Sequence, residues 1–266
     1  MATLTATSTQ PSHGTLSAEG EFSSQEETAA KQEFMHAPTF KDKNEERKYL
    51  KNRLAAAFRI FGKYGFDEGV AGHITCRDPV EQNTFWHRIL SRSTMTATII
   101  GGGEHKLLNV AAFMIHSAIH AARPMLSAQR IVTTPTVALS VHLESQSTAS
   151  LRTFFNGVVL AKEEGEVIAQ ALGNKKAALL QNHGLLTVGK TIEEATYWFL
   201  SLEKCCQVQL LADAAAAVHG AATLKMNKAD AAFRHRTVGS AKAGWLSAKP
   251  PFDKVHYDTG ADYCCN

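Results

Sequence analysis

The chain lacks a cysteine pattern suited to a disulfide framework or to a small zinc-binding knuckle. Its five cysteines include two adjacent pairs, and no two of them are spaced as Cys-x-x-Cys. An odd count with adjacent pairs favours a reducing compartment, so we expect a cytoplasmic protein. The first residues also lack a basic stretch followed by an apolar run, which argues against a secretory signal.

Long apolar runs, charge blocks and nucleotide-binding motifs are missing as well. No stretch of about 18 apolar residues occurs, so we expect no membrane span. The formal net charge is only +3, and no block of lysine and arginine suggests nucleic-acid binding. The Gly101-Gly102-Gly103 turn is not followed by Lys-Ser or Lys-Thr, which excludes a P-loop. A Gly-x-Ser-x-Gly elbow is also absent.

Composition and length are those of one well-packed α/β domain with additional polar segments. Residues 1–44 are rich in Ser, Thr, Gln and Glu, and we expect a disordered tail. A transit peptide is the alternative, but the acidic residues of this segment argue against it. Residues 45–223 form the predicted α/β domain, and residues 224–266 a polar C-terminal extension that wraps its surface. Inside the domain, residues 87–98 and 126–152 are rich in Ser and Thr and show neither strand nor helix periodicity.

Apolar periodicity and capping residues predict the regular elements of the domain. In residues 45–64, four large apolar residues recur at helical spacing. Thr191 followed by Glu194 has the form of a capping box and opens a long helix that ends near residue 217. The other predicted elements are helices at 107–122 and 162–172 and strands at 177–181 and 185–188.

Three histidines are candidates for chemistry. His183 lies on a turn between two predicted strands, where it could bind a metal ion or simply form hydrogen bonds within the turn; a single histidine is not a zinc site. His116 and His120 are four residues apart and share one helix face. Ser117 follows His116 where a metalloprotease helix has its glutamate, and the neighbours are apolar. We therefore expect a packing or helix-end role for this pair.

A glycine-containing turn at residues 72–75, Gly-His-Ile-Thr, could hold an anion through its backbone N–H groups and the threonine hydroxyl. The alternative is an ordinary glycine turn. Arg77 and Asp78 follow it, and we expect them to form a local ion pair at the surface. Cys205 and Cys206 lie within the long predicted helix, where a buried structural role is favoured.

Three stretches together resemble the class II aldolase/adducin family, in particular its fungal adducin-like branch. They are EGVAGHITCRDP at 68–79, LLNVAAFMIHSAIHAARP at 107–124, and ALLQNHGLLTVGKTIEEATYWFLSLEKCCQVQLLADAA at 178–215. The resemblance covers about residues 45–250. It implies an α/β/α sandwich on a mostly antiparallel central sheet, assembled as a homotetramer.

The same resemblance implies metal-dependent aldehyde-lyase chemistry. Family enzymes hold a divalent ion, commonly zinc, through a His-x-His pair and the histidine of an Asn-His-Gly turn, and a glutamate moves the proton. Here His183 matches the third metal ligand. Gly72 and Thr75 match the turn that holds the substrate phosphate, and His73 stands where the aldolases have asparagine. Ala112 occupies the glutamate position, so we predict no catalytic residue there.

The His-x-His pair should follow Arg123-Pro124 within about ten residues, but it is absent. If permitted codons are assigned to residues 130–153 and the reading frame is shifted by two bases, the segment can read HSHNTYGRAFCTLGKPIDSITQD. This reading restores a His-x-His pair at the expected place. The same shift over residues 93–98 can give DHDGN, a plausible hairpin turn. We therefore predict an impaired lyase that retains zinc poorly, with a small oxygenated or phosphorylated substrate. The alternative is a non-enzymatic, adducin-like binding module associated with actin and the cytoskeleton.

Overall fold

The structure, a computed structural model, describes residues 36–67, 72–87, 91–101, 109–125, 128–132, 148–151, 162–180 and 184–264, without the side chains of 128–132 and 148–151. Within these ranges, eight strands form one sheet in the order β4-β3-β2-β1-β5-β8-β7-β6. They are β1 (His73–Arg77), β2 (Thr84–His87), β3 (Ser91–Thr94), β4 (Ile99–Gly101), β5 (Ala128–Val132), β6 (Thr148–Leu151), β7 (Ala177–Leu180) and β8 (Gly184–Gly189). Every neighbouring pair is antiparallel except β6 with β7.

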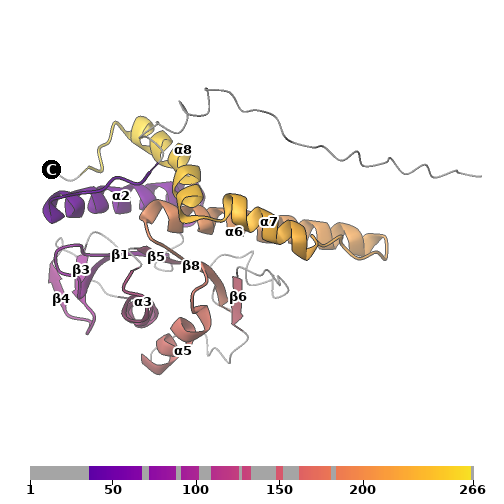
Figure 1. The fold of residues 1–266 in the computed structure, drawn as a ribbon, viewed down its shortest axis with the longest axis horizontal. Helices are drawn as coiled ribbons and strands as arrows, with labels where there is room; N and C mark the ends of the chain where they lie inside the picture. The colour runs from indigo at the N-terminus through magenta and orange to yellow at the C-terminus, as the bar shows by residue number, and fades with distance from the viewer. Residues whose placement is uncertain are drawn as a thin grey trace, which may run out of the picture. The chain divides into compact units, whose positions relative to one another are not determined.

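Helices cover both faces of this sheet (Figure 1). On one face lie α2 (Lys43–Lys63), α6 (Ile192–Val218) and α8 (Ala241–Thr259), and on the other lie α3 (Val110–Ala122) and α5 (Lys162–Leu172). Each interface has its own apolar core, the first around Phe61, Phe199 and Phe252 and the second around Ile115 and Ile119. This arrangement confirms the predicted α/β/α sandwich with a mostly antiparallel sheet.

The long helix begins where its capping residues predict. The Thr191 hydroxyl accepts a hydrogen bond from the Glu194 backbone N–H at 3.1 Å. The Glu194 carboxylate in turn accepts one from the Lys190 backbone N–H at 2.7 Å. The first bond satisfies one of the free N–H groups of the helix, and the second ties the preceding residue to its first turn. None of the helices in the described ranges is long and apolar enough to cross a membrane.

The two aperiodic patches contain strands that sequence periodicity did not reveal. Residues 87–98 hold β3, and residues 126–152 hold the backbone of β5 and β6. The strand β5 lies between β1 and β8, so Arg130 pairs with Ile74 on one side and with Thr187 on the other. Backbone pairing to two neighbours needs no particular side chains, which is why a strand forms without an alternating pattern.

The C-terminal segment enters the core, contrary to the expected surface extension. On α8, Ala248, Phe252 and Val255 are at most 1% exposed and pack against α2 and α6. At Gly244 an added Cβ would lie 2.9 Å from the Trp198 ring, so the helices approach closely there. The apolar residues of α8 recur at spacings of three and four, and burial of this stripe explains the packing.

A buried carboxylate connects four elements at one end of the sheet. Asp78 is fully buried and accepts hydrogen bonds from Arg47 at 2.9 and 3.1 Å and from the Trp86 indole at 2.9 Å. The Arg92 guanidinium lies 3.3 Å from its second oxygen. The predicted surface pair with Arg77 is therefore wrong, because Arg77 donates instead to the backbone carbonyls of Gln82 and His120.

The charge of Asp78 is well compensated. Burial raises the pKa of its carboxyl, but hydrogen bonds from Arg47 and from the backbone N–H groups of Glu81 and Val80 outweigh burial and hold the pKa below its usual value. A carboxylate with its pKa lowered by folding stabilises the native state above the pKa of the unfolded chain. That contribution is lost as the pH falls through the folded pKa.

Replacing Asp78 by alanine should lower the free energy of unfolding by about 3 kcal/mol, because Arg47 and Arg92 would lose a buried partner. Urea unfolding followed by circular dichroism measures this. The matched control is Asp253→Ala, which removes an exposed pair with Lys249 and should cost less than about 0.5 kcal/mol. Equal costs for the two variants would contradict the role assigned to Asp78.

Candidate functional site

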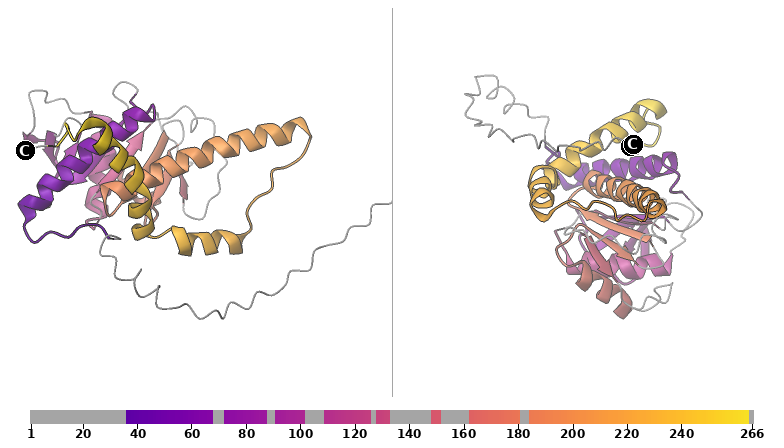
Figure 2. Two further views of the ribbon diagram at one scale, coloured as in Figure 1. Left: turned by 90° about the horizontal axis from the view of Figure 1, so that it is seen from above. Right: turned by 90° about the vertical axis from the view of Figure 1, so that its right-hand side faces the viewer.

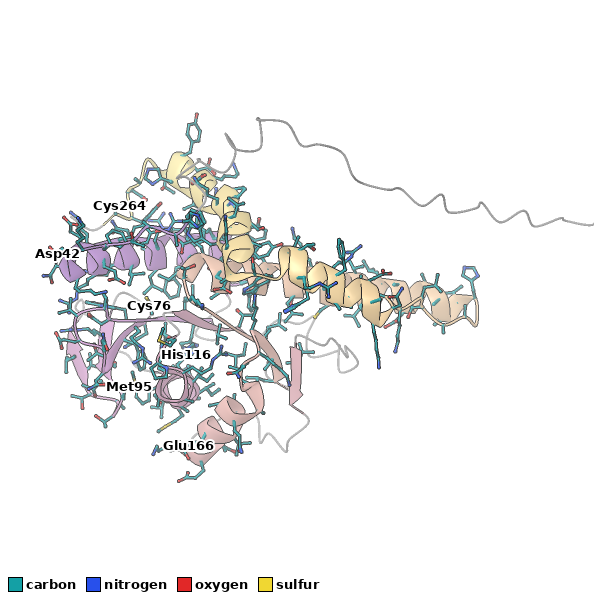
Figure 3. All side chains as sticks on the ribbon, viewed as in Figure 1. Asp42, Cys76, Met95, His116, Glu166 and Cys264 are labelled. Carbon is teal, nitrogen blue, oxygen red and sulfur yellow. The ribbon has the colours of Figure 1, made fainter. Side chains whose placement is uncertain are left out.

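The hydroxyl of Thr75 on β1 joins two histidines of α3. Its Oγ1 lies 2.8 Å from Nδ1 of His116 and 3.0 Å from Nε2 of His120. All three side chains are at most 2% exposed. Figure 3 shows His116 on the side of α3 that faces the sheet. The three groups therefore form a polar contact between β1 and α3 inside the domain, which we call the Thr75 bridge.

The Thr75 bridge has few protons to share. A threonine hydroxyl donates one hydrogen bond and accepts others, while a neutral imidazole has one donor and one acceptor nitrogen. With one hydroxyl proton, at least one of the ring nitrogens of His116 and His120 must act as the donor toward Thr75. Both contacts are satisfied with both rings neutral, so the bridge needs no charge.

Burial lowers the pKa of two histidines in this part of the domain, His120 and His87. Burial lowers the pKa of His120 well below its usual value, and the positive charge of Arg77 lowers it further. On β2, burial lowers the pKa of His87 to about 4, and its Nε2 lies 2.7 Å from the Ser93 hydroxyl. Neutral, buried imidazoles held by hydroxyls are typical of packing. This is the role that the sequence predicts for the pair on α3.

The start of α3 carries no acidic group. Ala112 lies in its first turn, is 9% exposed, and donates its backbone N–H to the Asn109 side chain at 3.1 Å. Asn109 thus caps the helix, and neither Asp nor Glu occurs anywhere in Val110–Ala122. A side chain that could exchange a proton with a substrate at this position is therefore missing from α3.

The structure brings some of the predicted site residues together. His73 is 8% exposed, and its ring centroid lies 6.4 Å from that of His116. Gly72 precedes it and is half-exposed. His73 pairs with Ile131 of β5, which pairs in turn with Leu186 of β8. The start of β1 therefore lies at the same end of the sheet as the start of β8.

The predicted metal ligand His183 lies outside the described residues, directly before Gly184 at the start of β8. Among the described residues, no group of three or more His, Cys, Asp or Glu side chains could hold a metal ion. The sequence contains no His-x-His pair to complete a site around His183. The described residues therefore do not provide a three-ligand metal site, and the chain lacks the His-x-His pair that the family resemblance implies.

Sequence reasoning missed that Thr75 connects the two histidines. The spacing of four between His116 and His120 correctly places both on one buried face. Their partner is 41 and 45 residues earlier in the chain, beyond the reach of any local pattern. The binding roles predicted for Gly72, His73 and Thr75 remain predictions, and the Thr75 hydroxyl already contacts two side chains of the protein.

Comparison with known proteins identifies the family. Residues 52–210 match the Class II Aldolase and Adducin N-terminal domain. The chain belongs to this family. L-fuculose 1-phosphate aldolase from Glaciozyma antarctica PI12 has a similar structure, with a TM-score of 0.75 and 39% sequence identity, covering 87% of this chain and 98% of that one.

Relatives in the class II aldolase/adducin family differ in their stated activities. A 4-hydroxy-3-prenylphenylpyruvate oxygenase/4-hydroxy-3-prenylbenzoate synthase from Streptomyces roseochromogenus subsp. oscitans is 38% identical, over 82% of this chain and 85% of its own length. Alpha-adducin from Rattus norvegicus is 31% identical, over 64% of this chain but only 26% of its own length. Membership therefore establishes the fold and not one reaction.

Replacing Thr75 by valine, which keeps the shape and removes the hydroxyl, should lower the free energy of unfolding by about 1–3 kcal/mol, because two buried imidazoles lose a partner. The matched control is Thr237→Val on an exposed helix, expected to change stability by less than about 0.5 kcal/mol. Urea denaturation compares the two. A cost at Thr75 no larger than at Thr237 would contradict the bridge.

Stability should fall as the pH drops below the pKa of an unfolded histidine, about 6.5. His120 and His87 have lowered pKa values in the folded chain, so between pH 6.5 and the folded pKa values the unfolded chain binds more protons. Each such proton contributes a slope of up to about 1.4 kcal/mol per pH unit. Urea midpoints measured from pH 8 to pH 5 test this, and His87→Gln should reduce the slope. Stability that rises toward pH 5 would contradict the assignment.

Proposed function

We propose that this chain is an impaired relative of the metal-dependent aldehyde-lyases, retaining the fold but not the groups for aldol cleavage. The observation that carries the proposal is Ala112 in the first turn of α3, a helix without a carboxylate. Aldol cleavage requires a positioned group that takes up or gives a proton. His116 and His120, the titratable side chains of that helix, are both engaged with Thr75.

The donor set for a metal supports the same proposal. In the family a divalent ion, commonly zinc, is expected, and His183 is the residue of this chain that we propose as its ligand. Tight zinc binding needs at least three protein ligands. The sequence lacks the His-x-His pair, and the described side chains form no cluster of three ligands, so we expect retention of the metal to be poor.

We place the loss of the two other metal ligands in residues 126–152, where the His-x-His pair is expected. These residues supply β5, a strand in the middle of the sheet beside β1 and β8. A two-base shift of frame over residues 130–153 can restore HSH in this region. The chain would then have lost two metal ligands together, while the backbone pairing of its neighbours keeps the strand in place.

A small oxygenated or phosphorylated molecule remains the proposed ligand, held at the start of β1 by Gly72, His73 and Thr75. The stated activities of the relatives include an aldolase and an oxygenase/synthase, which supports a family site that accepts several small substrates. We also propose that the protein is cytoplasmic and homo-oligomeric.

A second candidate function is a non-enzymatic, adducin-like binding module that associates with actin and the cytoskeleton. The match to alpha-adducin favours it, and Ala112 is compatible with it because a binding module needs no proton-transfer group. Against it, the chain spans only 26% of that relative's length. Cosedimentation of the purified chain with actin filaments decides between binding and no binding.

Metal content is the direct test of the impaired-lyase proposal. After incubation with excess zinc and dialysis, elemental analysis of the purified chain should find far less than one ion per molecule, and His183→Ala should not change the value. A control with zinc and no protein sets the background. About one zinc per chain, lost in His183→Ala, would show an intact site and contradict the proposal.

A further inference from the structure

The helix α7 (Lys228–Val238) packs on neither apolar core of the domain. Alone among the helices of the described ranges, it has no buried residue. Its side chains are exposed except those of Ala231 and Ala232, which are half-exposed. The left view of Figure 2 shows α7 apart from the sheet, between the loop that leaves α6 and the start of α8. A helix without buried contacts opens locally at little cost in free energy, so another protein can reach its side chains.

Thr237 lies in the last turn of α7 and is exposed. Its hydroxyl oxygen Oγ1 donates to the backbone carbonyls of Phe233 and Arg234, at 3.1 and 3.2 Å. Both carbonyls belong to α7 itself. These hydrogen bonds of Thr237 are therefore local, and they break when the last turn of the helix opens.

The charges around Thr237 are of one sign. Arg234 and Arg236 precede it by three residues and by one residue, and both are exposed. Neither Asp nor Glu occurs from residue 231 to residue 252. A protein that binds this segment can therefore hold an arginine with its own carboxylates, through charge-assisted hydrogen bonds, without repulsion from acidic residues beside Thr237. Protein kinases select substrates by such charge patterns.

Burial distinguishes Thr237 from a second hydroxyl with the same spacing. Ser91 also follows an arginine by three residues. However, Ser91 is 1% exposed and lies on β3, which pairs with β2 on one side and with β4 on the other. Such a hydroxyl cannot enter the active site of another protein while the domain is folded. Sequence spacing alone would select both residues, whereas exposure selects Thr237.

We propose that Thr237 is phosphorylated by an arginine-directed serine/threonine protein kinase. Its Oγ1 attacks the γ-phosphorus of ATP, the bond from that phosphorus to the β-phosphate oxygen breaks, and ADP leaves. The hydroxyl proton passes to the catalytic carboxylate of the kinase. The phosphate carries about −1.5 to −2 charges at pH 7. Because α7 holds three Lys or Arg residues and one Asp, the modification removes most of the positive charge of this exposed helix.

A kinase reaction on the full, folded chain tests the proposal. The probe is the catalytic domain of calmodulin-dependent protein kinase II with magnesium and ATP, chosen because it requires arginine three residues before its target. Intact mass gives the phosphate per chain, and peptide mass spectrometry locates it. We expect about one phosphate per chain, on Thr237. Thr237→Ala should abolish the incorporation, and Thr237→Ser should retain it.

Two variants on α7 separate recognition of Arg234 from a general effect of charge. Arg234→Ala should lower the initial rate at least about tenfold, because a charge-assisted hydrogen bond to the kinase is lost. The matched control, Lys228→Ala, removes a charge of the same sign farther from Thr237 and should change the rate less than about twofold. Both positions are exposed, so circular dichroism should show the same fold for both variants.

Phosphate on Thr237 that is slowed by Arg234→Ala and not by Lys228→Ala supports the proposal. No incorporation into the folded chain overturns it, and so does incorporation at Ser91 or Ser240 in place of Thr237. Equal rates for the two variants also overturn it, because the kinase would then not recognise the arginine beside Thr237. The metal content of the protein does not enter this test, so its result is separate from that of the impaired-lyase proposal.

Discussion

The contact of the Thr75 hydroxyl with His116 and His120 is the interaction on which the functional account depends. It joins the β1 strand to α3 across the second core, and it occupies the titratable side chains of the helix that faces the sheet. A helix whose histidines hold the fold together is not free to exchange protons with a substrate. In the proposed function, this contact and Ala112 together make α3 a packing element and not a source of catalytic groups.

On the opposite face of the sheet, buried carboxylates are likewise bound by other side chains of the protein. Asp78 binds Arg47 and Arg92, and Glu193 binds Arg53 at 2.5 Å and the Tyr49 hydroxyl at 2.8 Å. Each carboxylate has cationic or hydroxyl partners from distant parts of the chain. These groups fix α2 against the sheet and against α6, so their burial is explained by contacts within the protein.

The sequence predicted those helices that are marked by residues only a few positions apart. Helix α5 begins and ends at the predicted residues, and Thr191 marks the start of α6 because capping depends on residues three apart. The strands β3, β5 and β6 could not be predicted, since neighbouring strands pair with their backbones and not with a side-chain pattern. Asp78 was assigned the wrong partner for a related reason. Its partner Arg47 is 31 residues away, while Arg77 is adjacent only in sequence.

The candidate site was predictable in part. The family resemblance correctly identified the fold, and Ala112 could be read directly as a missing carboxylate. The Thr75 bridge depends on tertiary contacts, so it required the structure.

The central claim is most directly tested by comparing this chain with a version in which residues 130–153 are replaced by the frame-shifted HSHNTYGRAFCTLGKPIDSITQD. The measurement is the zinc bound per chain by each purified protein under identical conditions. The account predicts about one ion per chain for the replaced version and very little for this chain. Equal, full binding by both would contradict it, because this chain would then hold the metal without the His-x-His pair.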